Sequence, residues 1–433
     1  MTEETYAIIG AGPTGLAAAR NLDRHGLPWT GYELHTDVGG LWDIDGPRST
    51  VYDSAHLISS KTTTEFAEFP MPPGTPDYPG HRELLAYFRA FADTFDLRRN
   101  YRFGTEVTRV EPSGDGGWLV TSRGPQGEAS ERHTGVIIAN GTLSEPNVPT
   151  LPGGFDGELF HTSAYKRAEV LAGKRVLIVG AGNSGCDIAV DAVHHAASVD
   201  LSVRRGYHFV PKYVLGRPAD TLNQGRPLPA RVKQAIDSRL LRLFTGDPTR
   251  FGFPKPDHKL YESHPIVNSL VLHHLGHGDI TVRPDVERLE GDGVVFRDGS
   301  RHPYDVVVLA TGYRLHYPFI DRAWLNWTGP APDLYLNIFT DKDPNLFVLG
   351  MIEAAGIGWQ GRYEQAELVA SYLVARQRAP ERAREFEARV AGRRPDLSGG
   401  YRYLGVERMA YYVNKDAYRR AVRKEIEALG VAR

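Results

Sequence analysis

One glycine pattern occurs twice in this 433-residue chain and limits the folds that the chain can adopt. The loop at residues 9–15 recurs at residues 179–185, and each copy follows an apolar run and precedes a helical pattern. In such a GxGxxG loop the first glycine makes a tight turn, the second lets a pyrophosphate approach the backbone, and the third lets helix and strand pack closely. The helix N-terminus adds N–H groups that favour phosphate. Two nucleotide-binding units are therefore expected, with these contact residues: Gly10, Gly12, Gly15, Gly180, Gly182, Ser184 and Gly185.

The rest of the chain supports this architecture, because short apolar runs alternate with helical patterns. Runs typical of buried parallel strands cover residues 7–9, 135–139, 175–179, 305–309 and 346–349. Helical periodicity covers residues 14–25, 82–95, 184–196, 231–243, 362–376 and 381–390. The alternation predicts an α/β fold with two Rossmann-like dinucleotide-binding domains. The first domain is expected to be discontinuous, over residues 1–152 and 303–433, with the second inserted at residues 153–302.

The residues at the ends of the two second strands distinguish the nucleotides. In the first unit Glu33 stands about 20 residues beyond the loop, where a carboxylate hydrogen-bonds ribose hydroxyls and repels a 2′-phosphate. In the second unit the corresponding position is Arg204, followed by Arg205, and a guanidinium there can bind a 2′-phosphate. The first site therefore suits FAD and the second suits NADPH. Two solvated arginines at a strand end are the alternative interpretation.

Small and aromatic residues near other strand ends suit a flat ligand in the first site. The turn at residues 39–42 contains Gly40, Leu41 and Trp42, so the backbone can approach a flavin that Trp42 flanks. Thr311 follows the strand predicted at residues 305–309, and a small residue there would let the nucleotide pass. We expect these residues to contact FAD, although each is also compatible with ordinary turn chemistry.

Composition excludes several functional classes. The chain has 51 Lys and Arg against 53 Asp and Glu, so there is no basic surplus for nucleic acid. Its lone cysteine, Cys186, leaves no disulfide, no CxxC pair and no cysteine-rich zinc site, and we interpret it as a packing thiol. For His273, His274 and His277 a solvated loop is favoured over a metal site. No apolar run reaches the roughly 18–20 residues of a membrane span. With no signal peptide recognisable at the N-terminus, we expect a cytoplasmic protein without a membrane partner.

Residues 155–165 carry the most specific motif of the chain. Phe155, Gly157, His161 and Tyr165 match FxGxxxHxxx(Y/F), the signature of the flavin-containing monooxygenases, and the motif lies between the two glycine loops, as in that family. Related Baeyer–Villiger enzymes usually end the motif in Trp. The chain further resembles the family at residues 33–42, 105–107, 182–185, 263–265 and 310–313, so the likeness covers residues 6 to about 373.

The resemblance implies that NADPH reduces FAD and that the reduced flavin adds oxygen as a C4a-(hydro)peroxyflavin, which the retained NADP⁺ shields from water. This species would oxygenate a soft N or S atom of a small organic substrate, or a ketone in Baeyer–Villiger fashion. Val107 is implied as an FAD contact and His161 as part of the linker between the domains. Tyr165 and Tyr207 either line the route to the nicotinamide or simply pack. Members of the family commonly form homodimers, so the resemblance implies a homodimer.

The chain departs from the family at one catalytic position. The family commonly has an Asn in a VYxSxxxNxSK-like stretch, where its side chain supports the flavin adduct, and this chain has Ile58 there. An aliphatic side chain cannot donate that hydrogen bond, so Ser59 or Ser60 would have to replace it, or a short-lived adduct is tolerated. An NADPH oxidase that releases hydrogen peroxide is therefore an alternative. A flavoprotein without turnover is the non-enzymatic alternative, and a disulfide reductase would need a dithiol that one cysteine cannot provide.

Overall fold

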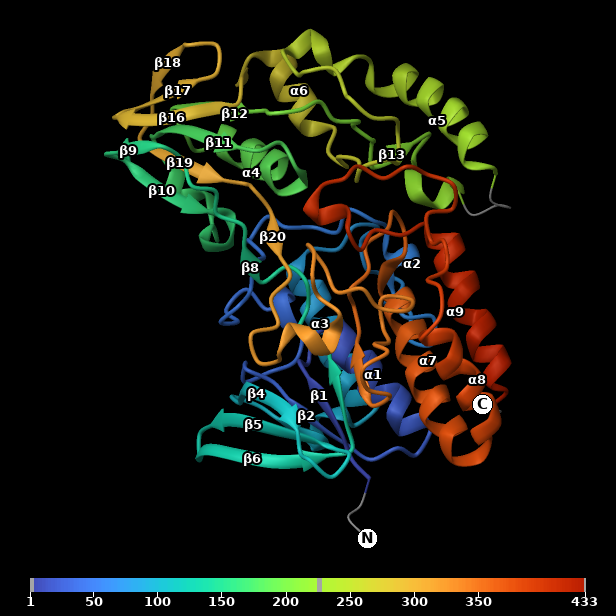
Figure 1. Ribbon diagram of the computed structural model, residues 1–433. Coiled ribbons are helices and arrows are strands. Elements are labelled where there is room, and N and C mark those ends of the chain that lie inside the picture. Colours follow the sequence, from blue (N-terminus) through green and yellow to red (C-terminus); the bar gives the residue numbers. More distant parts are fainter. Residues whose placement is uncertain (1–3, 224–227, 432–433) are drawn as a thin grey trace.

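Two parallel five-stranded sheets form the framework of the computed structural model, which describes residues 4–223 and 228–431 (Figure 1). The first sheet has the order β21-β7-β1-β2-β3 and contains β1 (Tyr6–Ile9), β2 (Trp29–Tyr32), β3 (Tyr101–Arg102), β7 (Gly135–Ile138) and β21 (Leu346–Val348). The second has the order β10-β19-β11-β12-β15 and contains β10 (Glu158–His161), β11 (Arg175–Val179), β12 (Ser198–Ser202), β15 (Ile280–Arg283) and β19 (Val306–Leu309). The prediction of an α/β fold with two Rossmann-like units is confirmed.

Both faces of the first sheet are covered, which explains why its strands are continuous apolar runs. Helices α1 (Pro13–Arg24) and α7 (Gly358–Arg378) pack on one face in a core that includes Ile8 and Leu368. The other face packs against an antiparallel sheet of β4 (Glu106–Pro112), β5 (Trp118–Gly124) and β6 (Gly127–His133). This unit also contains α2 (Lys61–Thr64), α3 (His81–Thr94), α8 (Pro380–Val390) and α9 (Lys415–Leu429).

The second unit is built in the same way. Helices α4 (Asn183–Val193) and α6 (Leu270–His277) pack on one face of its sheet, and the other face meets β9 (Gly153–Phe155), β16 (Val286–Gly291), β17 (Gly293–Phe296) and β18 (Arg301–Pro303). The histidines of residues 273–277 therefore lie on a helix, and their interpretation as a solvated loop is wrong, because Val271 and Leu275 anchor α6 to the core. Across residues 4–223 and 228–431, every helix is too short or too polar to cross a bilayer.

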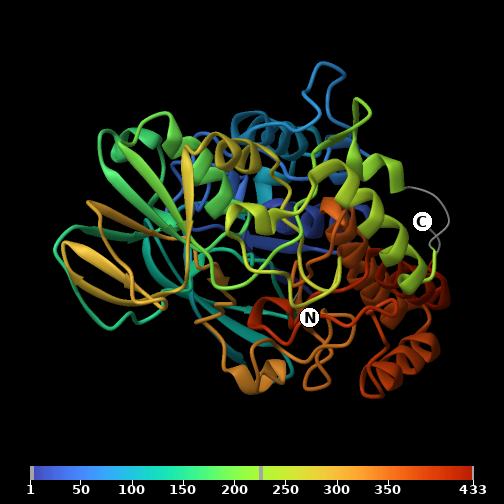
Figure 2. The same cartoon turned by 90° about the horizontal axis from the view of Figure 1, so that it is seen from above.

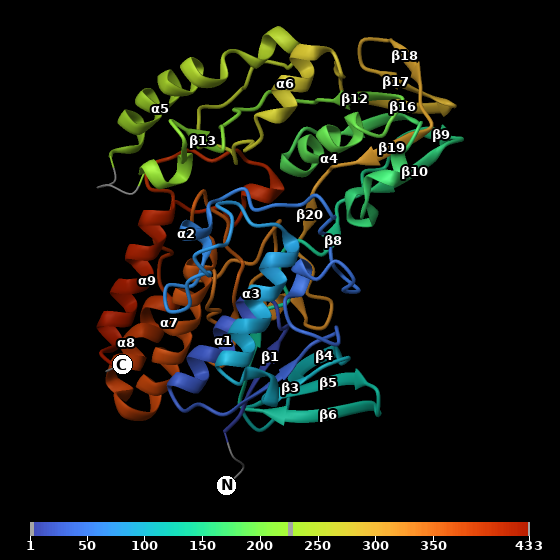
Figure 3. The ribbon, with the colours of Figure 1, turned by 180° about the vertical axis from the view of Figure 1, so that it is seen from behind.

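A short antiparallel pair joins the two units. Strands β8 (Glu145–Pro146) and β20 (Tyr313–Arg314) lie between the two sheets (Figure 3). Because β19 pairs with β10 and β11, it belongs to the second sheet, and the boundary expected at residue 303 falls one strand too early. We propose residues 153–309 for the second unit and residues 1–152 and 310–433 for the first; residues 1–3, 224–227 and 432–433 of these ranges lie outside the described part.

The chain between α8 and α9 runs back towards the second unit. Residues 396–414, here termed the C-terminal strap, lie between the two units (Figure 1, red). The amide of Leu404 donates to the carbonyl of Glu262 at 2.9 Å, and the amide of Val413 donates to that of Glu353 at 2.8 Å. Seen from above, helix α5 (Ala230–Thr245) of the second unit lies over this C-terminal region (Figure 2). The strap therefore contacts both units.

Candidate functional site

The two glycine loops have the same backbone conformation. Gly10 and Gly180 have φ values of 108° and 107°, a region that side chains disfavour. A Cβ on Gly15 would stand 1.8 Å from the carbonyl oxygen of Gly10, and one on Gly185 would stand 1.9 Å from that of Gly180. The tight turn and the close helix–strand packing that the pattern predicts are thus present in both loops.

The middle glycine of each loop leaves a helix N-terminus open. Gly12 is the N-cap residue of α1 and Gly182 that of α4, and neither helix has a side-chain cap. A Cβ on Gly12 would lie 3.5 Å from the Cα of Gly40, and a Cβ on Gly182 would have no described atom within 4 Å. The exposed N–H groups of both helices are therefore accessible to a ligand such as a phosphate.

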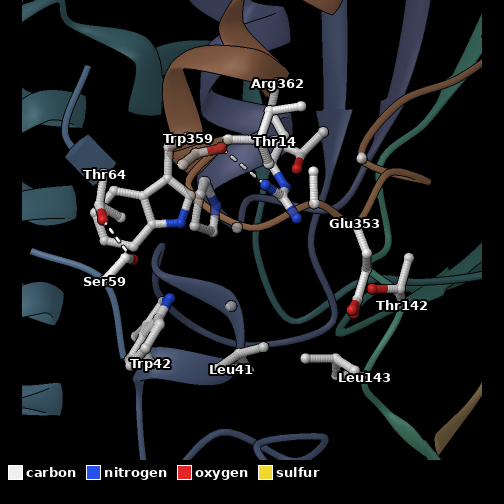
Figure 4. A pocket seen from close by; sticks show the side chains of 18 of the residues that line it. Thr14, Leu41, Trp42, Ser59, Thr64, Thr142, Leu143, Glu353, Trp359 and Arg362 are labelled. Carbon is white, nitrogen blue, oxygen red and sulfur yellow. Dashed lines mark hydrogen bonds between the residues drawn. The ribbon is translucent and has the colours of Figure 1, made fainter. Parts of the chain in front are cut away.

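A cavity of about 630 Å³ begins at the first loop and extends between the two units. The expected site residues along its wall are Gly10, Gly12, Glu33, Gly40, Leu41, Trp42, Ile58, Ser59 and Val107. Residues of the second unit and the strap complete it, among them Pro211, Asp220, Tyr261, His264, Tyr401, Tyr403, Arg408 and Tyr412. Figure 4 shows Leu41, Trp42, Ser59, Trp359 and Glu353 around this space.

Glu33 lies at the end of β2, where its carboxylate holds the first loop. One carboxylate oxygen accepts from the amide of Ala11 at 2.5 Å and the other from the amide of His35 at 2.8 Å. The side chain is buried, and burial raises the pKa of Glu33 while these backbone donors oppose the shift. The carboxylate is therefore fixed in orientation at the cavity wall.

The turn that contains Gly40 forms another part of the wall. Gly39 and Gly40 have φ values of 116° and 58°, and a Cβ on Gly40 would stand 2.9 Å from the Cα of Gly12. This close approach brings the turn against the glycine loop. Trp42 follows, and its ring meets that of Trp359 edge-on, with centroids 6.1 Å apart. Backbone and flat rings therefore line this part of the cavity.

The stretch that departs from the family pattern separates into two environments. Ile58 and Ser59 lie on the cavity wall, and the Ser59 hydroxyl hydrogen-bonds that of Thr64 at 2.7 Å. Ser60 lies outside the wall as the buried N-cap residue of the short helix α2 (Lys61–Thr64), and its amide donates to Asp220 at 2.7 Å. Ser60 is therefore not positioned to replace the family Asn, and Ser59 is the remaining candidate.

Neither tyrosine expected near the nicotinamide lines this cavity. Tyr165 is buried, its hydroxyl donates to Asp191 at 2.6 Å, and its ring contacts that of Tyr52 at 5.7 Å. Tyr207 packs against the core of the second unit, and burial raises its pKa. Packing, rather than lining the route to the nicotinamide, is therefore the interpretation that fits both residues. The Tyr165 hydroxyl and the Tyr207 ring both face elements of the second unit.

Thr311 also lies away from the cavity. Its hydroxyl donates to the carbonyl of Asn147 at 2.6 Å, and the preceding Ala310 is where a Cβ on Gly180 would collide, at 2.6 Å from the carbonyl oxygen. Thr311 therefore follows the strand that lies beside the second glycine loop, as Asn140 follows the strand beside the first. Thr311 is not among the residues that line the cavity, and its contact with FAD stays a prediction.

The second loop and its arginines form a separate surface. Ser184 and Gly185 stand in the first turn of α4. Arg204 is exposed and Arg205 is half-buried at the end of β12, and neither guanidinium has a hydrogen bond or an ion pair within residues 4–223 and 228–431. Both cations are therefore free to bind an anion from solution.

His161 connects the two units rather than facing the cavity. Its Nδ1 accepts from the amide of Ser163 at 3.1 Å, so Nε2 carries the proton and donates to the carbonyl of Gly312 at 3.0 Å. Burial lowers the pKa of His161, which keeps the ring neutral. The linker role implied by the resemblance agrees with these contacts, since both ring nitrogens are occupied by the backbone.

A charged cluster at the cavity wall is absent from the expected site residues. Arg408 of the strap donates to Glu353 at 3.0 Å, and although burial acts to raise it, Arg408 and His264 hold the pKa of Glu353 below its usual value. Burial lowers the pKa of His264 to about 4, and its Nε2 has no partner among the described residues. Only His264 had a sequence signal, through the motif at residues 263–265. The ion pair depends on the strap folding back, which no local pattern predicts.

Comparison with known proteins identifies the relatives of this chain. Residues 3–389 match the family model described as Flavin-binding monooxygenase-like. Flavin-containing monooxygenase 5 of Mus musculus is 31% identical over 382 residues, which cover 82% of this chain and 70% of that protein. Dimethylaniline monooxygenase (N-oxide-forming) 2 of Pan troglodytes is 32% identical over 392 residues, which cover 85% and 72%.

Solved structures share the fold at lower identity. Cyclohexanone monooxygenase from Rhodococcus sp. Phi1, bound to NADP⁺, has a TM-score of 0.72 at 22% identity over 98% of each chain. S-allyl-L-cysteine S-oxygenase from Allium sativum has a TM-score of 0.67 at 21% identity over 98% of this chain and 88% of that one. The chain therefore belongs to the flavin-containing monooxygenase family and is an FAD- and NADPH-dependent oxidoreductase.

Proposed function

We propose that this enzyme uses NADPH and molecular oxygen to oxygenate a soft nitrogen or sulfur atom in a small organic substrate. The observation that carries the proposal is the cavity that joins Gly12 and Glu33 at the first loop to Ile58, Ser59 and His264. A nucleotide anchored at the first loop would reach into the space that the second unit and the strap enclose. Substrate, flavin and oxygen would meet there away from bulk water.

The residues around the first loop fit FAD. The open N-terminus of α1 suits a pyrophosphate, and the Glu33 carboxylate stands where ribose hydroxyls are expected. The proposed FAD contacts are Gly10, Gly12, Glu33, Gly40, Leu41, Trp42 and Val107, with Gly15 acting through the packing of α1. When bound, FAD supplies the redox chemistry, which is reduction by NADPH followed by oxygen activation at C4a.

The chain's own residues position the flavin and exclude water. Leu57 and Ile58 give the wall an apolar section, and the rings of Trp42 and Trp359 give it a flat one. Helix α7 begins at Gly358 on this wall, so its N-terminal dipole would favour negative charge on a ring placed there. These contributions require no acid–base triad.

We assign NADPH to the second loop. The proposed contacts are Gly180, Gly182, Ser184, Gly185, Arg204 and Arg205. The uncapped N-terminus of α4 supports a pyrophosphate there, and the free guanidiniums support a 2′-phosphate. Hydride transfer would then require the nicotinamide to extend from this loop towards the cavity.

Two observations bear on the choice among oxygenation reactions. The signature ends in Tyr165, whereas Baeyer–Villiger relatives usually end it in Trp, which favours attack on sulfur or nitrogen. A relative named as N-oxide-forming and a neighbour named as an S-oxygenase act on such atoms. Ile58 favours a second candidate, an NADPH oxidase that releases hydrogen peroxide, because this aliphatic side chain has no donor with which to hydrogen-bond a group bound in the cavity.

Isotope labelling tests the proposal. The purified holoenzyme is incubated with NADPH, ¹⁸O₂ and one substrate at a time: dimethyl sulfide, trimethylamine or cyclohexanone. Oxygenation of the sulfide consumes one O₂, one NADPH and one proton and yields the sulfoxide, water and NADP⁺. We expect one ¹⁸O atom in the sulfoxide or N-oxide. Label in a lactone instead would establish the Baeyer–Villiger alternative, and hydrogen peroxide with every substrate would establish the oxidase.

The apolar residue in the family's Asn position gives a testable expectation. Ile58→Asn should lengthen, about fivefold, the lifetime of the flavin species whose spectrum is neither that of the oxidised nor that of the reduced form. The reason is that one added hydrogen bond contributes roughly 1 kcal/mol. The spectrum is followed by rapid mixing of the NADPH-reduced enzyme with oxygen. Ile58→Leu, which keeps an apolar side chain on the wall, is the control and should match the unaltered enzyme. An unchanged or shorter lifetime in Ile58→Asn would contradict this explanation.

A further inference from the structure

Five rings form a continuous face along one side of the cavity. They belong to Tyr261, His264, Tyr401, Tyr403 and Tyr412, and all five line the cavity. Centroid distances along the row are 5.9 Å from Tyr261 to Tyr401, 6.4 Å to Tyr403, 5.0 Å to Tyr412 and 5.9 Å to His264. We term this row the aromatic wall. Rings at this spacing contact one another edge-on or stacked, and a further flat ring in the cavity would extend the row.

The aromatic wall exists only because two distant segments meet. Tyr261 and His264 come from the second unit, and the three other tyrosines come from the strap. The amide of Leu404 donates to the carbonyl of Glu262, which fixes the two segments side by side. Tyr261 has a φ of 71°, an uncommon conformation for a bulky residue and one that strained functional sites often show.

The phenols of the aromatic wall are neutral, and charged groups flank both ends of the row. Burial raises the pKa values of Tyr401, Tyr403 and Tyr412, so these phenols stay neutral across the physiological range. At one end Lys233 Nζ lies 5.2 Å from the centroid of the Tyr261 ring, and the Tyr261 hydroxyl donates to Asp237 at 2.6 Å. At the other end Arg408 pairs with Glu353 at 3.0 Å. A row of rings of this kind favours a flat ring over a small aliphatic group.

We infer that the aromatic wall is a specificity element that binds the aromatic ring of a substrate whose sulfur or nitrogen atom is attached to that ring. The inference rests on the proposed function and narrows its substrate class to aryl sulfides and aryl amines. Tyr403 is the centre of the wall, since it contacts both Tyr401 and Tyr412 and is half-buried.

Paired substitutions at Tyr403 test the inference. Tyr403→Leu removes the ring, whereas Tyr403→Phe keeps it and loses only the hydroxyl's bond to the carbonyl of Ser398. For Tyr403→Leu we expect the KM of methyl phenyl sulfide to rise about three- to tenfold, as loss of one stacking contact implies. The KM values of dimethyl sulfide and NADPH should stay within about twofold. Tyr403→Phe should behave as the unaltered enzyme. The Kd of methyl phenyl sulfide, titrated into the oxidised holoenzyme by calorimetry, should follow the same order.

Each other outcome has a distinct meaning. Equal increases for both sulfides would show that the aromatic wall holds the cavity together without selecting rings, and would overturn the inference. A rise in the KM of NADPH alone would assign the wall to the nicotinamide and would also overturn it. If the unaltered enzyme oxygenates neither sulfide, the proposed function itself fails, whatever the variants do.

Discussion

Gly12→Ala should lower the affinity for FAD about tenfold or more and leave NADPH binding intact, while Gly182→Ala should do the reverse. A methyl group on Gly12 would meet the Cα of Gly40 at an ordinary 3.5 Å, and one on Gly182 would meet no described atom within 4 Å. The fold therefore tolerates both changes. Each methyl group would instead occupy the space into which a pyrophosphate must move to reach the helix N-terminus, and lost charge-assisted contacts of roughly 1.5 kcal/mol or more correspond to at least about tenfold.

The two variants serve as each other's control. Flavin content after purification and FAD titration of the stripped protein report the first loop, and anaerobic flavin reduction at varied NADPH concentrations reports the second. Melting temperatures should stay close to that of the unaltered enzyme. If Gly12→Ala retained FAD fully, or if Gly182→Ala bound NADPH normally, the corresponding loop would not be the pyrophosphate site.

Arg204→Ala combined with Arg205→Ala should raise the KM for NADPH about 30-fold or more and leave the KM for NADH nearly unchanged. Neither guanidinium has a hydrogen bond or an ion pair in the described part of the chain, and Arg205 acts on Asp257 only by adding to the effect of His258, whose hydrogen bond lowers the pKa of that carboxyl, so their removal costs little stability. Charge-assisted hydrogen bonds to a 2′-phosphate contribute about 2–3 kcal/mol, and NADH offers no such phosphate.

Single variants divide the role between the two arginines. Arg205 is half-buried beside Tyr207, whereas Arg204 is exposed. Replacement by lysine keeps the charge and loses the planar fork, so it should recover part of the affinity. A double variant that weakens NADPH and NADH equally would remove the phosphate assignment and leave the solvated strand end as the explanation.

The sequence predicts the framework of this protein well because its signals are local. The five strands expected from apolar runs all form, and α1 and α4 begin within one residue of the starts expected from the glycine loops. A loop between a buried strand and a helix has few conformations, and its glycines specify one of them. Cys186 is fully buried, as expected of a packing thiol.

The errors share a different origin, which is that they depend on how distant segments meet. Residues 273–277 were expected to form a loop, but Val271 and Leu275 pack this stretch as α6 against the core of the second unit. Ser60 follows the cavity stretch in sequence yet turns away to begin α2. The strap brings Arg408 to Glu353 across 55 residues of chain, and no hydrophobic periodicity or sequence motif predicts such a contact.

The most direct test of the central claim follows the flavin itself. The holoenzyme is reduced anaerobically with NADPH and then mixed rapidly with oxygen, once alone and once with methyl phenyl sulfide. If the enzyme is a flavin monooxygenase, we expect a transient species whose spectrum differs from those of the oxidised and reduced flavin. With the sulfide present, the decay of this species should yield sulfoxide in an amount equal to the flavin. Direct return to oxidised flavin with an equal amount of hydrogen peroxide, in both experiments, would contradict the account.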